Sequence, residues 1–111
     1  TSPLVVGNGV VTQIGGEQGG LLAFNRTTGA LAWRGAHSKS RGYASPVLAT
    51  IAGVRQIVAS AGDRAFGVNP ETGALLWSHD GPNVNAELSN PPMILPDNRV
   101  LIAYWDQTVL L

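Results

Sequence analysis

Four side chains that could bind a cation lie close together in the segment 80–87. Asp80, Asn83, Asn85 and Glu87 each offer a side-chain oxygen, and calcium takes about six to eight oxygen ligands in proteins. Their spacing does not follow the ligand pattern of an EF-hand loop. We therefore expect this segment to be a connecting loop rather than a calcium site.

Residues suited to catalysis or phosphate binding are equally sparse. His37 and His79 each stand alone, with no histidine or cysteine at ligand spacing, and the chain contains no cysteine. The glycine-rich segment 15–20 lacks the lysine of a phosphate loop and leads into a strand-like run, whereas a phosphate loop opens a helix. We interpret this segment as a hairpin loop. The sequence predicts no catalytic, cofactor-binding or metal-binding residue.

Composition excludes several classes of partner. The 111 residues carry seven basic and seven acidic side chains, so the formal net charge is +0 at pH 7. A nucleic-acid-binding domain needs a basic patch, and none is visible in the sequence. No apolar run reaches the roughly 20 residues of a transmembrane helix. The length suits a single folded domain.

The most informative pattern is a tract of eleven residues that occurs twice, as Ala23–Trp33 and Gly67–Trp77. Both copies read small-x-Asn-x-x-Thr-Gly-x-x-x-Trp, and equivalent residues lie 44 positions apart. A constant period of this size is typical of proteins in which one supersecondary unit is copied and stacked. Asparagine can close a turn on its own backbone, glycine allows positive φ, and tryptophan buries a large ring. The candidate structural residues are Asn25, Thr28, Gly29 and Trp33 in the first copy and Asn69, Thr72, Gly73 and Trp77 in the second.

Short apolar runs separated by Gly, Pro, Asn and Asp predict strands joined by hairpins along the whole chain. No stretch shows a sustained helical period of apolar residues. We expect an all-β chain built from units of four antiparallel strands, with a third unit that is incomplete. The expected strands are about 3–6, 9–14, 20–25 and 30–36, then 45–50, 55–61, 64–69 and 74–80, then 93–95, 99–103 and 108–111. The corresponding units span 2–44, 45–90 and 91–111.

The repeated tract resembles the tryptophan-docking motif of the quinoprotein-type, or PQQ-like, β-propeller repeat family, which reads Ala-x-Asp-x-x-Thr-Gly-x-x-x-Trp. Asn25 and Asn69 stand where the family prefers Asp, and Gly67 stands where it prefers Ala. The resemblance implies that residues 1–111 form about two and a half four-stranded blades of a partial β-propeller. It further implies that Trp33 and Trp77 are buried equivalently, each against a docking turn of an adjacent blade.

A partial propeller leaves surfaces to be covered, because a closed one needs roughly four to eight blades. Exposed strand edges and apolar faces favour association. We expect other blades to cover them, either in identical chains that form a homo-oligomer or elsewhere in a longer chain. Loops near the propeller axis usually carry the ligand site, and the candidates there are Arg41, Tyr43 and Glu87.

The favoured function is a non-catalytic propeller module that acts as a scaffold or a binding surface and holds no cofactor. The resemblance also leaves two alternatives open: part of a PQQ-dependent alcohol or sugar dehydrogenase, with PQQ and calcium, or part of a bacterial outer-membrane assembly scaffold. The dehydrogenases have adjacent cysteines, which this chain lacks, and a shared fold does not by itself imply catalysis. The resemblance implies a periplasmic or extracellular location.

Overall fold

The computed structural model describes residues 3–14, 20–35, 45–60, 64–80, 92–96, 98–103 and 108–110. Within these ranges every regular element is a β-strand, so the prediction of an all-β chain is confirmed. The strands form three separate antiparallel sheets. The first contains β1 (Leu4–Val6), β2 (Gly9–Ile14), β3 (Gly20–Asn25) and β4 (Leu31–Gly35); the second contains β5 (Val47–Ile51), β6 (Val54–Ser60), β7 (Arg64–Val68) and β8 (Leu75–Asp80); the third contains β9 (Met93–Ile94), β10 (Val100–Ala103) and β11 (Thr108–Leu110).

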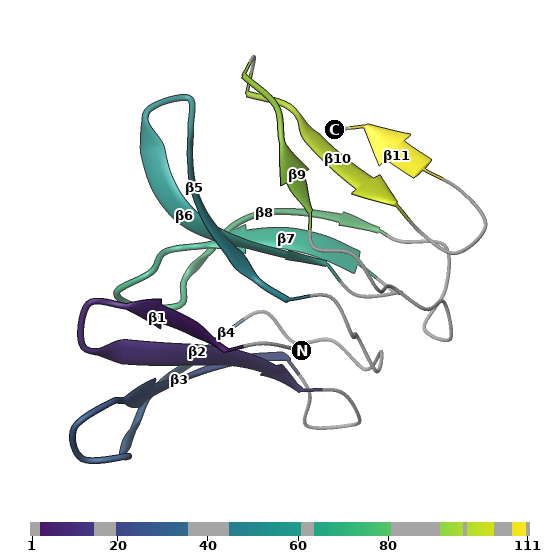
Figure 1. Cartoon of the computed structure of the whole chain (residues 1–111). Coiled ribbons are helices and arrows are strands. Elements are labelled where there is room, and N and C mark those ends of the chain that lie inside the picture. Colours follow the sequence, from purple (N-terminus) through teal and green to yellow (C-terminus); the bar gives the residue numbers. More distant parts are fainter. Residues whose placement is uncertain are drawn as a thin grey trace.

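Each sheet is a meander in which every strand pairs with the next one along the chain. The three sheets follow one another in space in the same order as in the sequence (Figure 1). The strands begin and end within two residues of the predicted positions. This agreement arises because glycine, proline and asparagine mark the turns so regularly that each strand has little freedom to shift.

The main hydrophobic core lies between the first two sheets. Phe66 of β7 is the largest fully buried side chain of the described residues, and it packs where β2 and β3 meet β6 and β7. The buried members are Val11, Leu21, Ala23, Ile57, Ala59, Phe66 and Val68, with Leu4, Val6 and Trp33 packed against them.

A smaller cluster joins the second sheet to the third. Val58, Ala65 and Val100 are buried in it, and Ile51 and Trp77 pack at its edge. Successive side chains of a strand point to opposite faces, and both faces of the second sheet are covered. For this reason β6 reads as a run of buried residues, rather than as the alternating pattern of a half-exposed strand.

Cross-strand pairing shows which positions of the first two sheets are equivalent. The matching rows are Val11–Ala23–Trp33 in the first sheet and Val58–Gly67–Trp77 in the second. The two tryptophans are 44 residues apart, but Val11 and Val58 are 47 residues apart. Equivalent positions on the early strands of each sheet must therefore be taken from the pairing and not from the sequence period.

Two phenylalanines test how much burial between the sheets contributes to the free energy of unfolding. Phe66 is 0% exposed between the first two sheets, whereas Phe24 is half-buried on the first sheet. Phe66→Ala should lower the free energy of unfolding by about 3–5 kcal/mol, as removal of a buried aromatic ring does. Phe24→Ala should cost markedly less, because part of its ring already contacts water.

Urea titration followed by circular dichroism measures both values. Equal losses for the two variants would contradict the assignment of the core to the space between the first and second sheets.

Candidate functional site at the joint between the first two sheets

The turn between β3 and β4 is closed by one asparagine. Asn25 Oδ1 accepts hydrogen bonds from the backbone N–H groups of Thr27 at 2.9 Å and Thr28 at 3.0 Å. The N–H of Gly29 donates to the Asn25 carbonyl at 2.7 Å, and Thr28 Oγ1 accepts from Ala30 N–H at 3.2 Å. The Asn25 side chain takes part through its oxygen alone, which accepts, so an amide serves this turn as well as the carboxylate of the family pattern would.

The turn between β7 and β8 repeats this geometry atom for atom. Asn69 Oδ1 accepts from Glu71 N–H at 2.8 Å and Thr72 N–H at 3.1 Å, and the Gly73 N–H donates to the Asn69 carbonyl at 2.8 Å. Gly29 and Gly73 have φ angles of 76° and 77°. The prediction of positive φ at both glycines is confirmed, and the reason is that an L side chain fits this conformation poorly.

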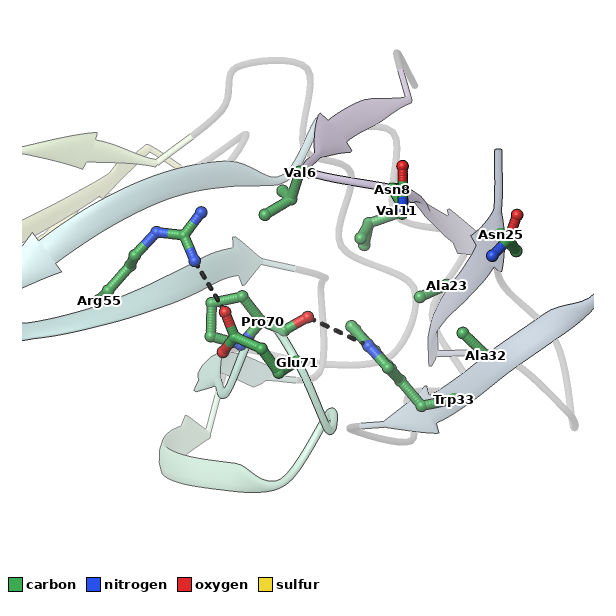
Figure 2. A pocket seen from close by; sticks show the side chains of 12 residues that line it. Val6, Asn8, Val11, Ala23, Asn25, Ala32, Trp33, Arg55, Pro70 and Glu71 are labelled. Atoms are coloured by element: carbon green, nitrogen blue, oxygen red, sulfur yellow. Dashed lines mark hydrogen bonds and ion pairs between the residues drawn. The ribbon is translucent and has the colours of Figure 1, made fainter. Parts of the chain in front are cut away.

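Trp33 connects the first sheet to this second turn. From β4, its indole N–H donates to the carbonyl of Pro70 at 3.2 Å (Figure 2). Its ring lies so close to Gly73 that a Cβ at that position would overlap it. In the same joint, a Cβ added at Gly35, at the end of β4, would overlap the backbone of Gly73. Glycine is thus required at position 73 both for its φ angle and for the closeness of its neighbours.

A cavity of about 310 Å³ lies beside this contact, between the two sheets. Arg55 and Glu71 form an ion pair of 2.9 Å at its rim (Figure 2), and because both side chains are largely exposed the pair contributes little to stability. The lining is mostly apolar and comes from Val6, Gly7, Asn8, Gly9, Val11, Ala23, Asn25, Ala32, Trp33, Arg55, Pro70 and Glu71.

Trp33 and Trp77 have the same degree of burial, but their indole N–H groups bond to different acceptors. Both rings are half-buried. The indole N–H of Trp77 donates to Gln56 Oε1 within its own sheet, at 2.6 Å, and its ring packs in the cluster that contains Val100 of the third sheet. In a third unit, the turn equivalent to that of Asn69 would follow β11 (Thr108–Leu110), beyond the described residues, so the docking of Trp77 on a turn of an adjacent blade stays a prediction.

The described residues of this joint meet through packing contacts and hydrogen bonds. They contain no group of three His, Cys, Asp or Glu side chains that could hold a metal ion, and no helix among them is long and apolar enough to cross a membrane. Arg41, Tyr43 and Glu87, the candidates for a binding face, lie outside the described residues, as does most of the segment 80–87. That binding face stays a prediction.

Sequence reasoning missed two residues of these joints. Pro70 supplies the carbonyl that Trp33 needs, and Gln56 supplies the acceptor for Trp77. Pro70 could have been found, because it sits inside the repeated tract. Gln56 carries no comparable signal, since it lies outside the tract and the sequence period pairs it with the wrong position of the first unit.

Four-stranded antiparallel meanders, joined by a tryptophan of one sheet on the asparagine-closed turn of the next, define blades of a PQQ-like β-propeller. The chain belongs to the PQQ-like repeat family described as outer membrane protein assembly factor BamB, whose profile matches residues 1–108.

Among solved structures, the crystal structure of BamB from Moraxella catarrhalis is similar, with a TM-score of 0.73 and 22% sequence identity. The similarity covers 98% of this chain and 35% of that chain, and it establishes the fold of a partial propeller. No curated protein matches the sequence.

The two turn glycines form a matched pair that isolates the contribution of Trp33 to the joint. Gly29→Ala places a methyl group where no described residue lies within 4 Å, so it should cost only the roughly 1–2 kcal/mol of a left-handed residue. Gly73→Ala carries the same φ cost and also displaces the Trp33 ring, which should add roughly 1–3 kcal/mol.

Denaturant unfolding of the two variants gives the difference directly. Combining each with Trp33→Phe supplies the control, because a smaller ring should relieve part of the Gly73→Ala penalty and leave that of Gly29→Ala unchanged. Indistinguishable losses for Gly29→Ala and Gly73→Ala would rule out a close Trp33 contact.

Proposed function

We propose that this chain is a non-catalytic PQQ-like propeller module, with blades at 2–44, 45–90 and 91–111, that acts as a scaffold or binding surface within a larger or oligomeric propeller. The observation that carries this proposal is an open docking face on the first sheet. It is the counterpart of a face that is fully covered on the second sheet.

The equivalent rows of the two sheets differ in burial. Val10 and Phe24 pair directly with one another in the first sheet, and they are the counterparts of the Ile57–Val68 pair in the second. Ile57 and Val68 are 0% exposed beneath the first sheet, whereas Val10 and Phe24 are only half-buried. Apolar surface of this kind favours a partner that removes it from water.

Among the described residues, no tryptophan packs on the docking turn of the first sheet. Pro70 and Gly73 of the second turn are buried, while Arg26 and Gly29 at the same positions of the first turn are exposed. Since both turns have the same hydrogen bonds, the first is preformed for a neighbouring tryptophan and needs no rearrangement to receive one. A preformed site of this kind lowers the conformational cost of association.

The partners we propose are other propeller blades, either in identical chains or elsewhere in a longer chain. The family description names outer-membrane protein assembly, and this supports a scaffold role in the bacterial envelope and a periplasmic location for the present chain. The described residues and the net charge of +0 favour protein partners over nucleic acid.

A titration with PQQ and calcium separates this proposal from a quinoprotein dehydrogenase. We expect no saturable change in quinone absorbance when the chain is added at micromolar concentration. A PQQ-dependent dehydrogenase treated in parallel provides the positive control. Saturable, calcium-dependent binding of PQQ would overturn the non-catalytic assignment and leave the fold unaffected.

Sedimentation equilibrium tests the open face. The chain of 11.6 kDa should sediment above its monomer mass at micromolar concentration, because several hundred Å² of open apolar surface, at about 25 cal/mol per Å², rival the stability of a small domain. Phe24→Glu should weaken this association through the open face.

Ser78→Glu, on the exposed outer strand β8, is the matched control and should leave the mass distribution unchanged. A compact monomer that melts cooperatively would contradict the proposal that other blades cover this face.

A further inference from the structure

The cavity between the first two sheets has the size of a site for a small molecule. Its volume is about 310 Å³, and small-molecule sites in proteins are clefts of roughly 300–1,000 Å³, mostly apolar with a few polar groups. Both sheets that enclose it are four-stranded meanders, and the lining residues all belong to the described part of the chain. The cavity therefore lies wholly within the first joint.

A bulge in β4 shapes one wall of this cavity. The pairing of β3 with β4 shifts by one residue between Ala23 and Phe24, so Ala32 is an extra residue in its strand. Successive side chains of a strand normally point to opposite faces, but Ala32 and Trp33 both line the cavity (Figure 2). The second sheet has the same bulge with Leu76 at this position, and the smaller methyl group of Ala32 leaves more room.

A positive and a negative side chain lie together at the rim (Figure 2). Arg55 and Glu71 are the only ionisable residues in the described lining. Arg55 Nη1 donates to Glu71 Oε1 at 2.9 Å, which uses one of several guanidinium N–H groups and one of the two carboxylate oxygens. Because the two side chains are 50% and 67% exposed, each can bind a further charged group. The rim as a whole carries no net charge.

An aromatic α-amino acid in its zwitterionic form complements this arrangement. Its carboxylate can accept from Arg55 while its ammonium group donates to Glu71, as charge-assisted hydrogen bonds. Its ring can enter the apolar part of the cavity, which Val6, Val11 and Trp33 form, and an indole wall favours an aromatic ring over an aliphatic chain. A ligand with a single charge would instead place that charge beside a like charge of the rim, which is unfavourable.

We propose that the cavity at the first joint binds a free aromatic α-amino acid, whose charged groups are held by Arg55 and Glu71 and whose ring packs against Trp33. This site goes beyond the scaffold role. It lies in the joint and not on the open face of the first sheet, so the failure of one proposal leaves the other intact.

Titration with L-phenylalanine tests the site directly. In ¹H–¹⁵N correlation spectra of the ¹⁵N-labelled chain, Trp33→Phe and Trp77→Phe identify the two indole N–H resonances. We expect the Trp33 resonance to shift saturably at about millimolar ligand, because one ring and two exposed charge contacts supply little beyond the cost of association. The Trp77 resonance should stay in place.

Two analogues of the ligand test the zwitterion. N-acetylphenylalanine lacks the ammonium charge and phenylalanine amide lacks the carboxylate, so each should bind about two- to fivefold more weakly, as the loss of one exposed charge contact predicts. Arg55→Gln and Glu71→Gln should weaken the binding of phenylalanine by a similar factor. Arg26→Gln is the matched control, because Arg26 is exposed and lies outside the cavity lining.

Ala32→Leu tests the cavity itself. The substitution brings in the residue that the second sheet carries at the same place, and it should weaken binding at least about tenfold because the cavity is filled. Ala30→Leu, at an exposed position outside the lining, should leave the affinity unchanged. An absent or non-saturable shift of the Trp33 indole would overturn the proposal. So would equal affinities for phenylalanine and its two analogues, or an unchanged affinity in a folded Ala32→Leu variant.

Discussion

The contact between Trp33 and the turn that contains Pro70 and Gly73 is the interaction on which the arrangement of the sheets depends. One indole ring packs on Gly73, where an added Cβ would overlap it, and the indole N–H donates to the carbonyl of the buried Pro70. Asn69 makes this possible, because it closes the turn on itself and holds that carbonyl in place. The core beneath, with Phe66 at its centre, is enclosed by the two sheets that this contact aligns.

Because each blade is apolar on two faces, no blade is complete by itself. Both apolar faces of the second sheet are buried, because the first sheet covers Ile57 and the third sheet covers Val58. The first sheet presents the same chemistry with one face open. A blade of this kind therefore needs neighbouring blades to bury its apolar faces. Burial of the same apolar surface stabilises the fold and drives association with other blades. This dependence on neighbours is the physical basis of the scaffold role that we propose.

The two repeated turns keep the same local geometry, and the tryptophans that follow them have different neighbours among the described residues. The turns closed by Asn25 and Asn69 share their internal hydrogen bonds, although the Arg26 N–H also donates to the Asn8 carbonyl and Pro70 has no N–H. The tryptophans that follow the two turns bond to different acceptors. Trp33 docks on the turn of the second sheet, whereas the equivalent turn of a third unit would follow β11, beyond the described residues. In stacked repeats each unit contacts only its neighbours, so a contact of this kind is complete only when the next unit is present.

The sequence by itself determined the local features of this protein. Strand positions, the two asparagine-closed turns and the positive φ of Gly29 and Gly73 all depend on residues within about five positions of one another, so the repeated tract was sufficient to predict them. The all-β class followed from the same short-range signals. The resemblance of that tract to the PQQ-like repeat then added the propeller family.

Tertiary structure alone decided which acceptor each tryptophan uses, because those partners lie 37 residues away for Trp33 and 21 residues away for Trp77. The sequence period of 44 residues aligns Gln56 with Thr12, whereas the strand pairing aligns it with Gly9, since the early strands of the two sheets are offset by 47 residues. A shift of three residues moves a side chain to the opposite face of a strand. Only the register of the folded sheets therefore places an acceptor beneath one tryptophan and none beneath the other.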